Sequence, residues 1–169
     1  MRGRLRLRAL SRVDPGTPAL LALAGSDLAY EVVRTTPARS AEESAELQGI
    51  PVGNLLRTIV IRLGADDYAF VLVPGGRQID WARLRALFGV KRLSLPDQAE
   101  AQDATGYERG AITPFGSKRA WPVVADATVP EVGRVAIGGG ARGVNLHVDG
   151  AELVRHLDAQ VADVTRPAG

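Results

Sequence analysis

The residues with the greatest potential for chemistry lie in the segment 105–116, which holds three glycines, one proline and two aromatic residues. Glycine at Gly110 can adopt a positive φ and lets another group approach the backbone closely. Pro114 has a fixed φ and holds the preceding Thr113 in an extended conformation. The pattern therefore predicts a stiff loop. Such a loop either packs tightly against a sheet or presents its backbone N–H and C=O groups to a ligand.

A second candidate is Arg57, which begins an apolar run. In a strand, Arg57 and Ile59 would share one face, and Thr58 and Val60 would share the other. A cation at such a position can hold a phosphate or a hydroxyl group. Alternatively, its aliphatic stem packs on the sheet while the guanidinium reaches solvent. Both interpretations of Arg57 are compatible with the sequence.

A third group of candidates surrounds the glycine run 138–140. This run is not followed by a helix and has no Gly-Lys-Ser/Thr, so it does not match a phosphate-binding loop. It predicts instead a place where a backbone or a ligand comes close. Asn145 and His147 then alternate on one face of the next expected strand. The histidine is either a functional group or a structural residue with a satisfied side chain.

The elements that must position these residues are short. A capping box formed by Ser40 and Glu43 predicts a helix that ends at Gly49. Residues 55–63 and 68–73 predict a hairpin with the loop 64–67. The further expected helices are 18–25, 81–88 (capped by Asp80), 97–104 and 149–157 (capped by Asp149), and the further expected strands are 30–34, 90–95, 122–126, 134–137 and 144–148. Short, hairpin-linked strands interspersed with helices indicate an α/β (α+β) fold with a mixed, mostly antiparallel, barrel-like sheet flanked by helices.

Composition narrows the chemistry further. The chain has no cysteine and only two histidines, which excludes thiolate nucleophiles, zinc–thiolate sites and histidine-rich metal centres. We therefore expect no metal and no cofactor. No apolar run is long enough to span a membrane, and a secretory signal is not recognisable, so the expected location is cytoplasmic.

The charge is distributed unevenly. Residues 1–12 carry five arginines and no acid, whereas the whole chain has a net charge of only +2. The expected organisation is a basic N-terminal arm (1–17), one domain (18–158) and a C-terminal tail (159–169). The arm either contacts a polyanion such as RNA or is simply a solvated terminus.

Five motifs, read in order, resemble one family. They are the segments 40–51, 56–60, 71–75, 105–116 and 138–143. In this order and spacing they are similar to the YbaK/ProX-type aminoacyl-tRNA editing domains, which are related to the editing domain of bacterial prolyl-tRNA synthetase. The resemblance implies a barrel-like α/β domain that hydrolyses the ester joining a wrong amino acid to the 3′ end of a tRNA. The implied partners are a mischarged tRNA and, in addition, an aminoacyl-tRNA synthetase.

The resemblance also implies roles for residues. Gly110 and Pro114 match a Gly-x-x-x-Pro loop whose backbone lines the amino-acid pocket, and Thr58 follows the cation as in the family's Lys-Thr pair. The predicted catalytic residues are Arg57 and Gly110. The predicted substrate-binding residues are Thr58, Ile112, Thr113, Pro114, Gly139, Gly140, Asn145 and His147. The small residues of the loop favour a small amino acid, of the size of alanine, cysteine, serine or proline.

One position departs from the family pattern, because this chain has Arg57 where the family usually has lysine. Arginine keeps the charge but replaces a compact ammonium with a longer planar fork. Two functions therefore remain open. The first is a free-standing trans-editing deacylase in which water is the nucleophile and a ribose hydroxyl of the substrate assists. The second is a catalytically weak or inactive module that binds aminoacyl-tRNA or a synthetase.

Overall fold

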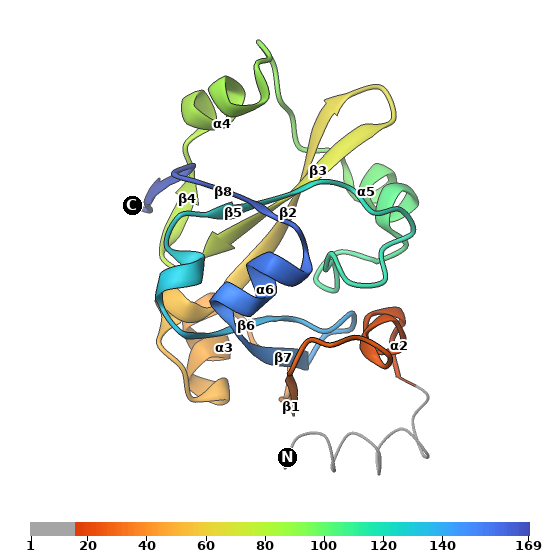
Figure 1. Cartoon of the computed structure of the whole chain (residues 1–169), viewed down its shortest axis with the longest axis vertical. Coiled ribbons are helices and arrows are strands. Elements are labelled where there is room, and N and C mark those ends of the chain that lie inside the picture. The colour runs from red at the N-terminus through yellow and green to blue at the C-terminus, as the bar shows by residue number, and fades with distance from the viewer. Residues whose placement is uncertain (1–15) are drawn as a thin grey trace.

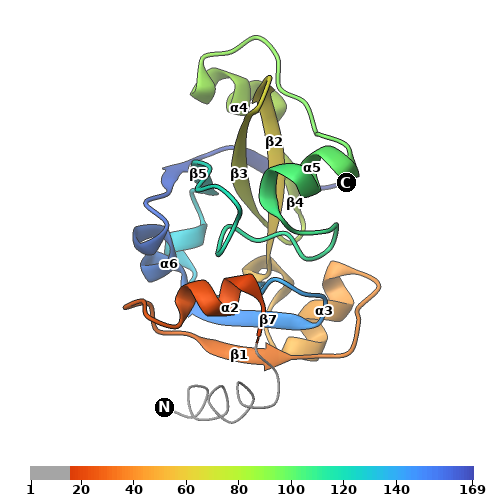
Figure 2. The same ribbon diagram turned by 90° about the vertical axis from the view of Figure 1, so that its right-hand side faces the viewer.

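The structure is a computed structural model and describes residues 16–169. The predicted basic arm lies, except for its last two residues, outside the described residues. Figure 1 and Figure 2 show one small sheet at one end of the molecule and a long hairpin that runs from it toward the opposite end. The mixed α/β class predicted from the sequence is confirmed.

Within residues 16–169 the strands form three sheets. The first has the order β2 (Leu56–Gly64), β3 (Asp67–Pro74), β5 (Val123–Asp126) and β8 (Gln160–Ala162). The second has the order β1 (Glu31–Arg34), β7 (Val144–Asp149) and β6 (Arg134–Gly138), and the third pairs β4 (Arg77–Ile79) with β9 (Thr165–Pro167). The pairs β3–β5 and β5–β8 are parallel and the others are antiparallel.

The sheets approach a barrel but do not close into one. A single parallel bridge between Leu55 and Ala136 joins the first sheet to the second, and a bridge between Arg62 and Ser94 is the other contact of this type along β2. Between these two bridges β2 is an edge strand, because its only ladder partner is β3. This open edge is where the candidate site lies.

Helices cover the sheets, and the caps predicted at Ser40, Asp80 and Asp149 are confirmed. They are α2 (Pro18–Leu23), α3 (Ala41–Gln48), α4 (Trp81–Phe88), α5 (Gln98–Thr105) and α6 (Gly150–His156), with short 3-10 turns at η1 (Val52–Asn54) and η2 (Val129–Glu131). Each N-cap side chain accepts the backbone N–H of the residue three positions further on, which satisfies an otherwise unpaired donor. Gly49 and Gly89 end α3 and α4 in the left-handed conformation.

Two local predictions are wrong. Residues 90–95 form no strand, because only Ser94 pairs with β2, through its two backbone hydrogen bonds to Arg62. The hairpin loop is shorter than expected: Gly64 pairs with Asp67, so the turn has two residues, and Asp66 takes a φ of 54°.

The segment 159–169, expected to be a tail, contains the strands β8 and β9. The buried carboxylate of Asp126 accepts the Thr165 hydroxyl at 2.7 Å and thereby ties β9 to β5. Burial alone would raise the pKa of Asp126, but the hydrogen bonds from Thr165 and Thr128 hold it below the usual value. The last residues are thus part of the folded unit.

The core consists of two apolar clusters separated by the first sheet. Phe70 and Leu72 on β3 pack in the larger cluster with residues of the second sheet, α2 and α6. Val71 and Val73, on the other face of β3, pack in the smaller cluster under α4. β3 is buried on both faces, so it forms a rigid support for its neighbour β2.

Candidate functional site

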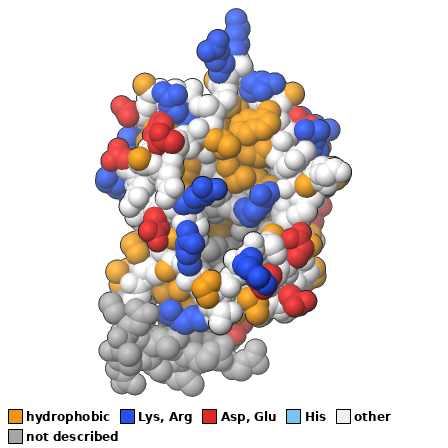
Figure 3. All heavy atoms as spheres, turned by 180° about the vertical axis from the view of Figure 1, so that it is seen from behind, with side chains coloured by type: hydrophobic (Ala, Val, Ile, Leu, Met, Phe, Trp, Pro, Cys, Tyr) orange, Lys and Arg blue, Asp and Glu red, His pale blue; other side chains and the backbone are white. Residues whose placement is uncertain are grey.

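A cleft of ≈ 750 Å³ opens along the free edge of β2. Its opposite wall is formed by the loop 105–116 and the start of α5, and it is bounded by Gly138 of β6 and by α3. On the face seen in Figure 3, Lys and Arg side chains gather around a hollow, and exposed hydrophobic side chains lie next to it. The cleft therefore combines a basic rim with an apolar wall.

The floor of the cleft is an unpaired strand edge. Both the N–H and the C=O of Arg62 bond to Ser94, away from β3. Because hydrogen-bonding direction alternates along a strand, the N–H and C=O groups of Thr58 and Val60 point to that same edge. Both residues line the cleft, so their backbone donors and acceptors face its interior.

The hydroxyl of Thr58 also faces this space. Its Oγ1 is buried and has no hydrogen-bond partner within the described part of the chain. Buried polar atoms in folded proteins almost always have a partner. A ligand group in the cleft would supply one.

The opposite wall is held in shape by the backbone of the loop 105–116. Gly110 has a φ of +87°, and a Cβ built there would come within 3.0 Å of Nε of Arg142. Arg142 donates from Nη2 to the carbonyl of Arg109 at 3.0 Å. Tyr107 donates its hydroxyl to the carbonyl of Phe115 at 2.5 Å, and burial raises the pKa of Tyr107 to about 12. These contacts brace the loop from both sides.

The structure brings together five of the ten predicted site residues. They are Arg57, Thr58, Gly110, Ile112 and Asn145. Asn145 is fixed by a hydrogen bond from its Nδ2 to the carbonyl of Val33 at 3.1 Å.

The other predicted residues lie behind the wall of the cleft. Thr113 is fully buried, and neither it nor Pro114 lines the cleft. Gly139 packs on Val144, and Gly140 packs on Thr17 and Ala19. The member of the glycine run that borders the cleft is Gly138.

His147 lies inside the second sheet and is only 5% exposed. Its Nε2 is 2.9 Å from Oε1 of Gln48 on α3. Burial, with a smaller contribution from Arg134, lowers the pKa of His147 below 6.5. The residue is therefore neutral at neutral pH and lies apart from the cleft.

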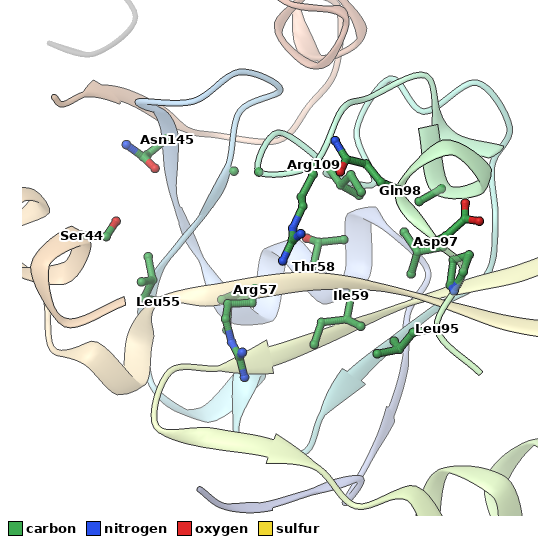
Figure 4. Close-up of a pocket in the computed structure, with 17 residues that line it drawn as sticks. Ser44, Leu55, Arg57, Thr58, Ile59, Leu95, Asp97, Gln98, Arg109 and Asn145 are labelled. Carbon is green, nitrogen blue, oxygen red and sulfur yellow. The ribbon is translucent and has the colours of Figure 1, made fainter. Parts of the chain in front are cut away.

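Arg57 lines the cleft, but its guanidinium points away from it. Nη2 of Arg57 donates to the carbonyl of Arg77 on β4 at 2.6 Å. Figure 4 shows the side chain directed away from Thr58 and Arg109. In turn, Nε of Arg77 donates to the hydroxyl of Thr165 on β9 at 2.7 Å.

Arg109 is a cation that the sequence reasoning missed. Its side chain extends from the loop 105–116 toward Thr58 (Figure 4). Within residues 16–169 no hydrogen bond or ion pair of its guanidinium is found, and the only acidic residue that lines the cleft is Asp97. The available signal was its position next to Gly110, in the loop predicted to face a ligand.

Among the described residues no group of three or more histidine, aspartate or glutamate side chains is arranged to hold a metal ion. No helix in residues 16–169 is long and apolar enough to cross a membrane.

The geometry defines a class of protein, namely a small α/β domain with a cleft between a sheet edge and a glycine–proline loop. The chain belongs to the aminoacyl-tRNA editing domain family, whose sequence model matches residues 35–156. The resemblance inferred from the five motifs is thereby confirmed.

Individual relatives agree with this assignment. EbsC of Enterococcus faecalis, described as a candidate Cys-tRNA(Pro)/Cys-tRNA(Cys) deacylase, is 24% identical over 80% of this chain and 83% of its own length. The proline–tRNA ligase of Thermosipho africanus is 28% identical over 64% of this chain, a match that spans only 19% of the ligase. A crystal structure of a candidate trans-editing enzyme for prolyl-tRNA synthetase superposes with a TM-score of 0.81 at 25% identity and covers 90% of this chain and 96% of that one.

Proposed function

We propose that the chain is a free-standing deacylase that hydrolyses the ester of a mischarged tRNA. The observation that carries the proposal is the buried, unpartnered hydroxyl of Thr58 in a cleft that faces the Gly110 loop. Membership of the editing domain family and the similarity to EbsC support it.

In this proposal, the cleft acts by positioning and by fixed dipoles. Backbone N–H groups at the β2 edge and in the Gly110 loop are suited to hold the ester carbonyl as negative charge develops on its oxygen. Water attacks the carbonyl carbon and forms the new C–O bond. The bond to the ribose oxygen then breaks, and that oxygen leaves with a proton. A neighbouring ribose hydroxyl of the substrate assists by orienting the water.

The guanidinium of Arg109 points toward this space in Figure 4. An unpaired cation in a partly apolar cleft stabilises developing negative charge more than it would in open water. We propose that Arg109 supplies this charge. The predicted role of Arg57 as an anchor for phosphate or hydroxyl requires its guanidinium to leave the carbonyl of Arg77.

The apolar wall is suited to the side chain of the amino acid. Ile59, Ala101 and Ile112 line the cleft, and none of them offers a polar side-chain group. The substrate is therefore proposed to carry a small amino acid, such as alanine, cysteine, serine or proline. A tRNA of the prolyl system is the proposed carrier, in line with the relatives.

The test is a panel of mischarged tRNAs incubated with the purified protein. We expect faster loss of the ester for at least one pair with a small amino acid, and a slower reaction with Arg109→Gln. Arg155→Gln is the matched control, because Arg155 pairs with Glu152 on α6 and does not line the cleft. If no pair is hydrolysed faster than in buffer, the proposal is refuted.

A second candidate function is a binding module without turnover, which would hold aminoacyl-tRNA or a synthetase. It is favoured by one observation, namely that Arg57 is bonded to the Arg77 carbonyl instead of pointing into the cleft. The variant Arg57→Lys separates the two functions. A large gain in hydrolysis supports the binding module, whereas a loss shows that the arginine works in a deacylase.

A further inference from the structure

A second hollow of ≈ 470 Å³ adjoins the reaction cleft. Its remaining walls are the loop 35–41, which leads from β1 into α3, and the loop 141–143 between β6 and β7. Arg57, Arg109 and Gly110 line both spaces, so the two hollows are continuous. A substrate whose ester lies near Thr58 could therefore extend into the second hollow.

The charged side chains that line this hollow are all positive. Its lining includes no acidic residue and four arginines, Arg39, Arg57, Arg109 and Arg142; of these, Arg57 directs its guanidinium away, to the carbonyl of Arg77. Arg39 pairs with Glu43 at 3.6 Å, but no ion pair of the other three is found within residues 16–169. Several arginines elsewhere on the surface are paired with an acid, among them Arg83 with Asp163 and Arg134 with Glu31. Clustered, unpaired arginines in a groove attract an anion, and their planar forks fit phosphate oxygens.

The groove is also rigid. The N–H of Thr35 donates to the carbonyl of Gly143 at 2.9 Å, which ties its two loops together. Gly143 lies so close to the Thr35 carbonyl that a Cβ would come within 2.6 Å of it. On its other side Arg142 bonds to the carbonyl of Arg109. Arg142 and the backbone of the two loops are thus held in place before any ligand arrives, which lowers the entropic cost of binding.

We propose that this hollow, the arginine groove, binds the phosphodiester backbone of the single-stranded RNA end that carries the ester. The inference rests on the proposed function and deepens it. Arg109 and Arg142 would contact the phosphates next to the ester, and Arg39 would contact the backbone further along. The hydroxyls of Thr35, Thr36 and Ser40 line the same path and add uncharged polar groups to it.

The test measures binding of uncharged tRNA as a function of salt concentration. Each lost phosphate contact lowers the slope of log affinity against log salt by about 0.7 for a single strand. We expect this change for Arg142→Gln and for Arg39→Gln, and no change for Arg155→Gln. Arg142→Lys should retain most of the slope, because it keeps the charge.

A second readout separates binding from bracing of the loop. The aminoacyl ester of adenosine has the reacting bond but no phosphodiester. We expect Arg142→Gln to slow both substrates, because its hydrogen bond to the carbonyl of Arg109 is lost, and to raise KM for the charged tRNA alone. Equal loss on both substrates with an unchanged salt slope would show that Arg142 only supports Gly110, and it would overturn the inference.

Arg39→Gln keeps the inference falsifiable if the Arg142 variant fails to fold, since Arg39 does not contact the Gly110 loop. If the salt slopes of Arg39→Gln and Arg142→Gln are unchanged, the arginine groove does not bind the RNA backbone. The proposed deacylase function still stands in that case if the ester is hydrolysed. Altered slopes in a protein that hydrolyses no ester support the groove and refute the proposed function. The two failures are therefore distinguishable.

Discussion

Replacement of Gly110 by alanine tests how the loop 105–116 supports the cleft. The φ of +87° at Gly110 is a conformation that residues with a Cβ rarely adopt, and the strain costs about 1–2 kcal/mol. For a chain of this length, 1 kcal/mol lowers Tm by about 2–4 °C. We therefore expect Gly110→Ala to lower Tm by about 2–8 °C.

The same substitution should also reduce activity. The new Cβ would stand 3.0, 3.2 and 3.3 Å from Nε, Cζ and Nη2 of Arg142. The guanidinium would have to move by a few tenths of an ångström, which disturbs its hydrogen bond to the carbonyl of Arg109. A misplacement of 1 Å can cost about a hundredfold in rate. We expect a loss of roughly tenfold, equivalent to about 1.4 kcal/mol in the barrier.

The assay combines thermal unfolding with single-turnover hydrolysis of a charged tRNA. Gly133→Ala is a matched control, because Gly133 has a φ of +80° and nothing within 4 Å of its would-be Cβ. The control should lose a similar amount of stability and keep the wild-type rate. If both variants keep that rate, or both lose it equally, Gly110 and Arg142 do not support the reaction.

Two further predictions concern buried polar groups. Thr58→Val removes a buried hydroxyl without a partner, so we expect the free energy of unfolding to stay level or rise by about 1 kcal/mol. Hydrolysis should slow in this variant, whereas Thr58→Ser should keep its activity. A valine variant as active as wild type would contradict the proposed contact. His147 has a lowered pKa in the folded state, so it stays neutral there while the unfolded chain takes up a proton below its pKa of about 6.5. Its contribution to stability is therefore present above that pH and is lost as the pH falls below it. Thermal unfolding between pH 7.5 and 5 should show this loss, and a His147→Gln variant with the same pH dependence would exclude His147 as its source.

Much of the fold follows from local signals in the sequence. The caps at Ser40, Asp80 and Asp149 and the helix ends at Gly49 and Gly89 depend on residues only a few positions apart, so they could be predicted. The strand predicted at 90–95 is wrong, because its formation depends on more than local signals. Its apolar residues satisfy a strand pattern, but whether the segment pairs with β2 depends on residues far away in the sequence, and only Ser94 does so.

The site was harder to predict for the same reason. The sequence places a cation at Arg57, but the direction of its side chain depends on the carbonyl of Arg77, which β4 and β9 hold in place. The residue type cannot tell the three glycines of the run 138–140 apart. Only their packing in the folded chain shows that Gly138 is the one that borders the cleft. Arg109 stands out only because the structure shows its charge to be unpaired.

The hydrogen bonds of Asp126 have a practical consequence for any attempt to shorten the protein. The family match ends at residue 156, and β8 and β9 lie beyond it. A fragment cut at that boundary would lose Thr165 and Val164, two of the donors that compensate the desolvation of a carboxylate only 1% exposed. It would also lose the hydrogen bond from Arg77 to the Thr165 hydroxyl. Because Arg57 donates to the carbonyl of Arg77, the position of the Arg57 guanidinium would then change as well. A tag or truncation at the C-terminus can therefore alter the chemistry of a cleft formed by other strands.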